Sequence, residues 1–315
     1  MSRDGATPYD RGMTRTPFGR TGLHVSPLGF GTAPIGFIKT EQETVGRILN
    51  TLLDAGVNLI DTAASYQGSE EVIGATVGHR RSEFVLVSKC GSKVPQADGA
   101  PWSAELVRNT VDAALRRLQT DVIDVMLLHS CDLATLQKGE ALGALVDARN
   151  AGKIRHAGYS GDNDAAAWAA AHPDVAVIET SVSFVDQANV DAVLPVARMK
   201  NVGVLAKRPI GNSCWRELSE FQAFYPEYVR PYRERLEKMG ITSASVGFAG
   251  DWPELALRFT LSQAGVHTAI IGTTNPDNAR ANIELAKKGP LPAEVGEKIR
   301  QAFARAGGGK WPGLQ

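Results

Sequence analysis

The feature that most constrains the fold of this sequence is a repeated alternation of short apolar runs with longer segments of helical periodicity. Nearly continuous runs of Val, Ile and Leu suit strands that are buried on both faces, and such strands belong to parallel sheets covered by helices. One run, the first, is weaker than the others because it contains Pro and two Gly. The predicted strands are Ser26–Thr32, Val57–Asp61, Phe84–Lys89, Val122–His129, Ile154–Ser160, Val175–Thr180, Val202–Lys207 and His267–Gly272.

The segments between these runs place apolar residues at steps of three and four, as a helix with one buried face does. Helices are predicted over Glu41–Ala55, Glu105–Leu118, Leu133–Ala148 and Gln187–Met199. Eight strands alternating with helices favour an α/β fold, the (β/α)8 or TIM barrel. The alternative, a doubly wound sheet, usually has about six strands and a GxGxxG phosphate loop after the first. Here the first strand is followed by GFGTAPIG, which lacks that spacing and leads into no clear helix.

The ends of the chain are expected to add little to this barrel. Segments Thr14–Phe18 and Leu23–Ser26 flank the turn sequence GRTG, which predicts an N-terminal β-hairpin rather than a ninth barrel strand. Residues 1–13 are expected to form a polar tail and residues 14–315 a single barrel domain. The C-terminal GGGKWPGLQ is expected to fray, with a flap anchored by Trp311 as the alternative.

The longest interruption of the pattern, Ile210–Trp252, lies between the seventh and eighth predicted strands. It is rich in aromatic residues and contains a predicted helix around Arg233–Met239. Long loops after barrel strands usually carry binding or lid functions. We therefore expect this segment to face the functional site.

Composition excludes several classes of function. Among 315 residues, 34 Lys and Arg balance 34 Asp and Glu, which argues against nucleic acid or an acidic membrane as the main partner. No apolar run approaches the ~18 residues that span a bilayer. The odd set Cys90, Cys131 and Cys214 contains no CxxC pair, so neither disulfides nor a metal site is expected. A cytoplasmic protein is the resulting expectation.

Three predicted strands end in an ionisable residue, namely Asp61, Lys89 and His129. The carboxyl ends of all strands of a barrel lie on one face, so these side chains are expected to meet there. Each residue alone has an ordinary structural explanation, such as a helix cap, a solvated lysine or a hydrogen-bonded core histidine. The coincidence of three favours a functional site, because charges in a partly dry pocket are costly unless they pair.

Tyr66 follows Asp61 in a short loop, DTAASYQGSEE, and its phenol can return over the same face. An ammonium about 4 Å away, at an effective dielectric of ~20, would lower the pKa of a phenol by about three units. Lys89 is expected to have this effect, with Asp61 holding Lys89 and His129 orienting a substrate carbonyl. The set predicts proton transfer to an oxygen, whereas the alternative for Tyr66 is packing on the barrel rim.

A proton donor alone does not reduce a carbonyl, so a hydride must come from a cofactor. Gly272, Thr273 and Thr274 follow the last predicted strand, and phosphate sites are frequent at that place in barrels. Small residues leave backbone N–H groups and hydroxyls free to bind a phosphate. The same residues are also compatible with an ordinary turn and helix start.

The chain resembles the aldo-keto reductases from about Thr16 to about Leu285, in the stretches FGRTGLHVSPLGFGT, NLIDTAASYQGSEEVIG, FVLVSK, DVIDVMLLH, GKIRHAGYS and IIGTTNPDNARANI. The most specific signature is DTAxxY followed by Ser-Glu-Glu. The resemblance implies a hairpin that closes the bottom of the barrel and NADPH extended across its top, with NADH as an alternative. It also implies a catalytic tetrad, which here is Asp61, Tyr66, Lys89 and His129.

The cofactor positions match the family less closely. Gly161 stands where the family has Asn, Glu179 where it has Gln, and Lys207 where an aromatic residue commonly stacks on the nicotinamide. At the adenosine end, Gly272 replaces a basic residue and Asn278 an arginine, with Arg280 nearby. The cofactor-binding residues implied by the resemblance are Gly31, Thr32, Asp61, Ser160, Glu179, Lys207, Arg208, Pro209, Gly272, Thr273, Thr274, Asn278 and Asn282.

These features together predict an NAD(P)H-dependent oxidoreductase that interconverts small aldehydes or ketones and alcohols. Tyr66 and His129 are expected to contact the substrate, together with Trp102 and Trp215 from the loops. The alternatives are a cofactor-binding regulatory module with slow turnover, an NAD-dependent sugar dehydrogenase and a lyase that uses Lys89 as a Schiff-base nucleophile. The sequence leaves the substrate and the oligomeric state open.

Overall fold

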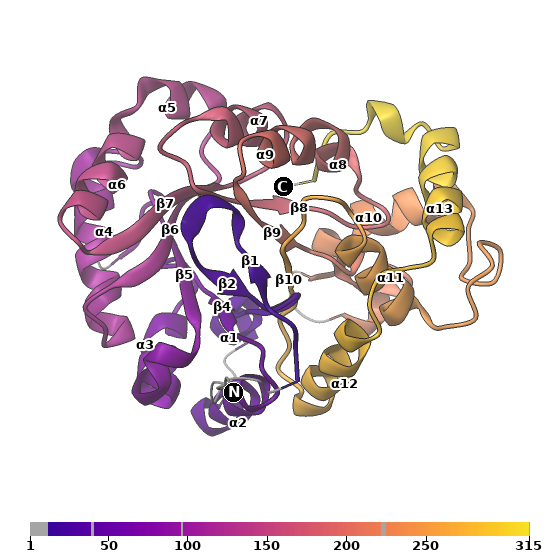
Figure 1. Cartoon of the computed structure of the whole chain (residues 1–315), viewed down its shortest axis with the longest axis horizontal. Coiled ribbons are helices and arrows are strands. Elements are labelled where there is room, and N and C mark those ends of the chain that lie inside the picture. Colours follow the sequence, from indigo (N-terminus) through magenta and orange to yellow (C-terminus); the bar gives the residue numbers. More distant parts are fainter. Residues whose placement is uncertain (1–11, 39–40, 96, 222–224, 315) are drawn as a thin grey trace, which may run out of the picture.

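The computed structural model describes residues 12–38, 41–95, 97–221 and 225–314. Eight parallel strands close into a barrel in the order β10-β3-β4-β5-β6-β7-β8-β9, with helices around it (Figure 1). The barrel strands are β3 (Leu28–Gly31), β4 (Leu59–Asp61), β5 (Val85–Cys90), β6 (Ile123–His129), β7 (Ile154–Ser160), β8 (Val177–Ser181), β9 (Gly203–Lys207) and β10 (Thr268–Ile270). The (β/α)8 fold predicted from the sequence is confirmed, and no strand extends more than one residue beyond its predicted run.

The predicted N-terminal hairpin is also present, as the antiparallel pair β1 (Thr16–Pro17) and β2 (His24–Val25). It crosses one end of the barrel in Figure 1. Phe18 follows β1, is fully buried and packs against the layer of side chains that fills the barrel interior. The other members of this layer are Val25, Leu59, Val85, Val87, Val125, Leu127, Val177, Leu205 and Ile270. The interior at this depth is therefore apolar, which confines ionisable groups to the far ends of the strands.

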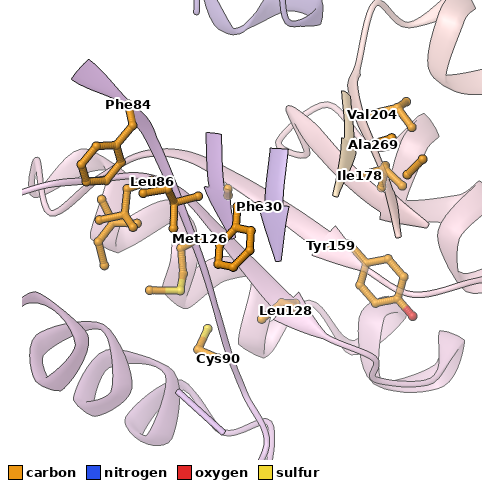
Figure 2. Packing of buried hydrophobic residues seen from close by; sticks show 14 of the residues in the cluster. Phe30, Phe84, Leu86, Cys90, Met126, Leu128, Tyr159, Ile178, Val204 and Ala269 are labelled. Atoms are coloured by element: carbon orange, nitrogen blue, oxygen red, sulfur yellow. The ribbon is translucent and has the colours of Figure 1, made fainter. Parts of the chain in front are cut away.

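A second core lies between the outer face of the strands and the helices. Because successive residues of a strand point to opposite faces, Val125 and Leu127 fill the interior while Met126 and Leu128 face the helices. Figure 2 shows Met126 and Leu128 in this outer layer with Tyr159 of β7. Burial on both faces explains why the strands read as continuous apolar runs.

The α-helices that surround the barrel are α1 (Ala33–Ile38), α2 (Gln42–Asp54), α3 (Ser69–Val77), α4 (Ala104–Leu118), α5 (Leu133–Lys138), α6 (Glu140–Asn150), α7 (Asn163–Ala171), α8 (Ala188–Ala192), α9 (Leu194–Met199), α10 (Tyr225–Met239), α11 (Trp252–Leu261), α12 (Pro276–Lys287) and α13 (Ala293–Arg305). Short 3-10 helices span Gly19–Thr21, Gly78–Glu83, Gly211–Ser213, Leu218–Glu220 and Gly308–Lys310. No helix in the described ranges is both long and apolar enough to cross a membrane.

Several helices differ from the sequence prediction. The predicted helix over 133–148 is two helices, because Gly139 adopts a left-handed conformation with φ of +75° between them. The predicted helix over 187–199 is also two, since a proline near the start of α9 cannot donate the backbone bond that would continue α8. A short helix, α1, follows GFGT where no helix was expected, and six residues are too few to show periodicity. Helix α10 begins at Tyr225 rather than near Arg233.

The C-terminal segment does not fray through Leu314, contrary to expectation. Arg235 donates to the carbonyl of Pro312 (2.6 Å) and lies 5.2 Å from the centre of the Trp311 ring. Leu314 donates its N–H to Asp186 (3.0 Å) and accepts from Arg208 (2.6 Å). The segment therefore returns from α13 to the barrel, as Figure 1 shows. At the other end of the chain, Met13 is buried, and residues 1–11 of the expected tail lie outside the described residues.

Replacing Phe18 with Ala tests whether the hairpin stabilises the barrel. We expect F18A to lower the free energy of unfolding by about 3–5 kcal/mol, because it removes a fully buried ring from the interior layer. Urea unfolding followed by circular dichroism measures the loss. Met199 of α9 is 75% exposed, so M199A serves as a control that should change stability by less than about 0.5 kcal/mol. Equal effects of the two substitutions would contradict a structural role for the hairpin.

Candidate functional site

A buried ion pair between neighbouring strands lies at the centre of the site. Lys89 of β5 donates from Nζ to Oδ1 of Asp61 at the end of β4 (2.5 Å) and to the carbonyl of Thr62 (3.0 Å). Both side chains are almost fully buried. Thr32 fixes the strand end, because its hydroxyl and its N–H both donate to the carbonyl of Asp61 at 2.9 Å. The sequence-predicted pairing of Asp61 and Lys89 is thus present in the structure.

A second carboxylate reaches the same ammonium from across the barrel. Oε2 of Glu179, on β8, lies 3.2 Å from Nζ of Lys89. Burial disfavours the charged ammonium, but the carboxylates of Asp61 and Glu179 outweigh it and raise the pKa of Lys89. Burial, with Glu179 next in effect, raises the pKa of Asp61 despite the neighbouring ammonium. Lys89 is therefore held as a cation between two acids.

Tyr66 lies in the loop after β4, where a turn holds its backbone. Helix α1 packs closely on this loop, since a Cβ built on Gly36 would lie 2.8 Å from the backbone of Tyr66. Nζ of Lys89 is 5.3 Å from the centre of the Tyr66 ring, and the His129 ring meets it edge-on at 5.9 Å. The structure thus brings the four predicted side chains together.

The ionisation of Tyr66 differs from the sequence prediction. Burial raises the pKa of this phenol, and the nearby carboxylates of Asp61 and Glu179 act in the same direction. Lys89 lowers the pKa, but by less than these effects together. The predicted depression of the pKa is wrong because that argument counted the ammonium and left out desolvation and the second carboxylate.

His129, at the end of β6, is neutral. Burial lowers the pKa of its imidazole to about 3, and the positive charges of Lys89, Lys207 and Arg208 add to the effect. Its Nδ1 lies 3.4 Å from the hydroxyl of Ser65. A neutral imidazole can both donate and accept a hydrogen bond, which is what orienting a carbonyl or an alcohol requires.

A second group of charges surrounds the end of β9. Asp162 accepts hydrogen bonds from Ser181 and Asn189, while its Oδ2 lies 3.0 Å from Nζ of Lys207 and 3.7 Å from Arg208. Arg208 also donates to the hydroxyl of Tyr228 (2.5 Å). Two cations therefore share one buried carboxylate.

These side chains border a cavity of about 440 Å³ at the carboxyl end of the barrel. The predicted site residues that line it are Gly31, Asp61, Tyr66, His129, Ser160, Glu179, Lys207, Arg208, Pro209, Gly272, Thr273 and Thr274. Lys89 lies behind them, below the cavity surface. Residues that sequence reasoning did not assign to the site include Pro34, Phe221, Tyr225 and Tyr228. The last three belong to the aromatic insertion after β9, so the length of that segment was the available signal.

Other predicted residues lie elsewhere in the part of the chain that the structure describes. Trp102 and Trp215 are not among the residues that line the cavity. The Trp102 ring packs against the backbone at Gly91, and the Trp215 ring stacks on Trp252 at 6.0 Å. Thr32 is buried beneath Asp61, while Asn278 and Asn282 lie on α12 beyond the cavity. The described residues contain no cluster of three or more His, Cys, Asp or Glu suited to a metal ion.

The residues around the cavity offer hydrogen-bonding groups that suit a nucleotide. A Cβ on Gly272 would collide with the carbonyl of Gly31, so glycine lets the ends of β10 and β3 approach and expose backbone to the cavity. Gly161 likewise leaves room for the hydroxyl of Tyr159, which excludes a larger side chain there. Oε2 of Glu179 accepts no hydrogen bond from the described residues and can accept one from an amide group. Thr273 and Thr274 bring hydroxyl groups to the cavity just before α12, which begins at Pro276 and whose first free N–H, that of Asp277, is capped by Asn275.

Comparisons with known proteins agree with this architecture. The model of a family described as the aldo/keto reductase family matches residues 27–304. L-galactose dehydrogenase from Arabidopsis thaliana is 25% identical over an alignment of 282 residues, and the match covers 84% of this chain and 85% of that protein. NADH-specific methylglyoxal reductase from Escherichia coli is 25% identical over 305 residues, and the match covers 86% of this chain and 93% of that protein. An aldo-keto reductase structure from Bacillus halodurans is 27% identical with a TM-score of 0.77 and covers 92% of this chain and 96% of that one.

The lowered pKa of His129 predicts a loss of stability in acid. An unfolded histidine has a pKa near 6.5. As pH falls from about 6.5 toward 3 the unfolded chain takes up a proton that the folded imidazole does not, and stability falls. Between pH 7 and 4.5 we expect the wild type to lose about 2 kcal/mol more than H129Q, as measured by urea unfolding at both values. Equally steep losses would show that another group is responsible.

Proposed function

This chain belongs to the aldo/keto reductase family, and from that premise we propose that it reduces small carbonyl compounds with a nicotinamide cofactor and Tyr66 as the proton donor. The observation that supports this most strongly is the meeting of Tyr66, Lys89 and His129 at one cavity, with Lys89 paired to Asp61. These residues come from separate strands and loops, and together they provide a neutral acid, a fixed cation and a neutral hydrogen-bonding ring.

The nicotinamide ring, when bound, supplies the hydride that goes to the carbonyl carbon. Tyr66 gives the proton of its hydroxyl to the carbonyl oxygen and is left as a phenolate beside Lys89. The fixed ammonium stabilises that developing negative charge without having to reorganise, which is where electrostatic catalysis gains most. His129, neutral at physiological pH, positions the carbonyl oxygen by a hydrogen bond. The reverse sequence oxidises an alcohol.

We assign the cofactor to the residues around the cavity and at the start of α12. Ser160 and Glu179 can hold the nicotinamide amide. Lys207, Arg208 and Pro209 border the neighbouring part of the cavity, where the rest of the cofactor would lie. Gly31 and Gly272 face each other across the ends of β3 and β10. Thr273, Thr274, Asn278 and Asn282 provide hydroxyl and amide groups at the adenosine end. NADPH is the cofactor that we propose, with NADH as the alternative that the name of the Escherichia coli relative suggests.

The other functions are less well supported. A Schiff-base lyase needs a neutral lysine, whereas the carboxylates of Asp61 and Glu179 keep Lys89 charged despite its burial. A sugar dehydrogenase uses the same proton-transfer residues in the oxidative direction, and the Arabidopsis relative carries such a name. Titrating both nucleotides by fluorescence quenching, followed by a panel of aldehydes, ketones and sugars, distinguishes these activities. Nucleotide binding without turnover on the whole panel would favour a regulatory module.

Removing the hydroxyl of Tyr66 tests the assignment of the proton donor. We expect Y66F to lower kcat by about 10²–10⁴-fold, because the carbonyl oxygen then lacks its acid, while the Kd of the nucleotide changes little. Steady-state kinetics and quenching titrations measure the two quantities. Y159F is the matched control, since the buried Tyr159 hydroxyl donates to the carbonyl of Cys131 and does not line the cavity. Full turnover in Y66F would refute the proposal.

Cofactor preference is predicted to depend on an exposed ion pair on α12. A 2′-phosphate is normally recognised by positive charge, but Asp277 binds Arg280 at 2.7 Å. Replacing Asp277 with Asn frees Arg280, and we expect NADPH affinity to rise by up to about tenfold relative to NADH, as measured by quenching. E284Q breaks the comparable Glu284–Lys287 pair further along the helix and should leave the ratio unchanged. An unchanged ratio in D277N would place Arg280 away from the phosphate.

A further inference from the structure

Glu179 has more contacts with the catalytic group than binding a nucleotide amide requires. Its side chain is almost fully buried and its Oε2 lies 3.2 Å from Nζ of Lys89. Asp61 and the carbonyl of Thr62 accept two hydrogen bonds from the Lys89 ammonium, and Asp61 alone can balance its single charge, so Glu179 adds a second carboxylate. An extra buried charge is costly unless it has a partner, and its presence here calls for an explanation.

The charges around Tyr66 show what the additional carboxylate does. The groups that face the phenol from the surrounding elements are Asp61 of β4, Lys89 of β5, His129 of β6, Glu179 of β8 and Tyr228 of α10. His129 is neutral, so Asp61, Glu179 and Lys89 are the ionisable groups among these that act most directly on the phenol. Both carboxylates raise the pKa of the phenol and only the ammonium lowers it.

We infer that Glu179 is a positioning residue of the catalytic centre, which holds Lys89 jointly with Asp61 and uses its negative charge to keep the phenol of Tyr66 protonated at alkaline pH. This rests on the proposed role of Tyr66 as proton donor. In reduction the proton moves from the Tyr66 hydroxyl to the carbonyl oxygen, and solvent returns a proton to the phenolate. Glu179 thus extends the pH range over which the reducing form of the enzyme exists.

The variant Glu179→Gln keeps the shape of the side chain and removes its charge. We expect the alkaline fall in kcat/KM for carbonyl reduction to move down by about one pH unit, because the phenol then faces one carboxylate and one ammonium. At a pH above the new midpoint this is a loss of about tenfold relative to the wild type. The same shift is measurable without turnover, as the tyrosinate absorbance of E179Q minus that of E179Q/Y66F.

A matched control separates this effect from the general cost of a lost buried acid. Glu70 of α3 is as deeply buried, accepts from Ser88 and pairs with Arg117 at 2.6 Å, and does not line the cavity. Glu70→Gln is expected to lower stability and to leave the pH profile in place. If E179Q changes only the Kd of the nucleotide, Glu179 binds the cofactor amide and the inference is wrong.

A double-mutant cycle tests the contact with Lys89 in the protein without cofactor. Asp61→Asn and Glu179→Gln each leave the ammonium with one carboxylate, whereas the double variant leaves it with none. We expect the double variant to lower the urea midpoint by more than the sum of the single variants. Additive effects would overturn the shared hold on Lys89. Because this cycle needs no turnover, it remains decisive if the wild type reduces no carbonyl and the proposed function fails.

Discussion

The burial of one ammonium inside a closed barrel is the constraint on which the site depends. Removing Lys89 from water costs several kcal/mol unless close partners replace its hydration. Those partners, Asp61 and Glu179, lie 118 positions apart in the sequence (179 − 61), so only the closed barrel brings them to one point. Below them the interior is filled by apolar side chains and closed by Phe18. The charged layer can therefore form only at the carboxyl ends of the strands.

The two-residue period of strands makes much of this layer predictable from the sequence. On β5 the inward residues are Val85, Val87 and then Lys89, and on β6 they are Val125, Leu127 and then His129. An apolar run that ends in an ionisable residue therefore indicates both the strand and the site. Glu179 follows the same rule two residues after Val177 on β8. What the period cannot provide is how far apart inward residues on distant strands lie, because that depends on the stagger of the barrel. The contact between Glu179 and Lys89 was missed for this reason.

The remaining differences arise where side chains meet backbone or loops. Arg208, Arg235 and Asp186 hold the C-terminal segment through hydrogen bonds to its backbone carbonyl and N–H groups. Because every residue has such backbone groups, these contacts cannot be predicted from a sequence pattern. Arg208 itself adopts φ of +55°, an unusual conformation for a residue with a side chain, and its contacts with Ser181, Tyr228 and Leu314 hold it there. The tryptophans expected at the site pack elsewhere, Trp102 on the backbone at Gly91 and Trp215 on Trp252 and Phe184. Loop packing has no period from which it could be predicted.

The arrangement of charges explains why Tyr66 and His129, the two residues that we propose to act on the carbonyl oxygen, are neutral although ionisable groups surround them. Lys89, Lys207 and Arg208 oppose protonation of His129, while the carboxylates of Asp61 and Glu179 oppose ionisation of Tyr66. Burial favours the neutral form of both rings, because it disfavours whichever form is charged: it raises the pKa of Tyr66 and lowers that of His129. A reaction that moves one proton from a phenol to an oxygen then begins from two uncharged groups in a site of low dielectric. The negative charge that develops during transfer forms beside an ammonium already fixed in place, and this fixed geometry is what the costly burial of Lys89 provides.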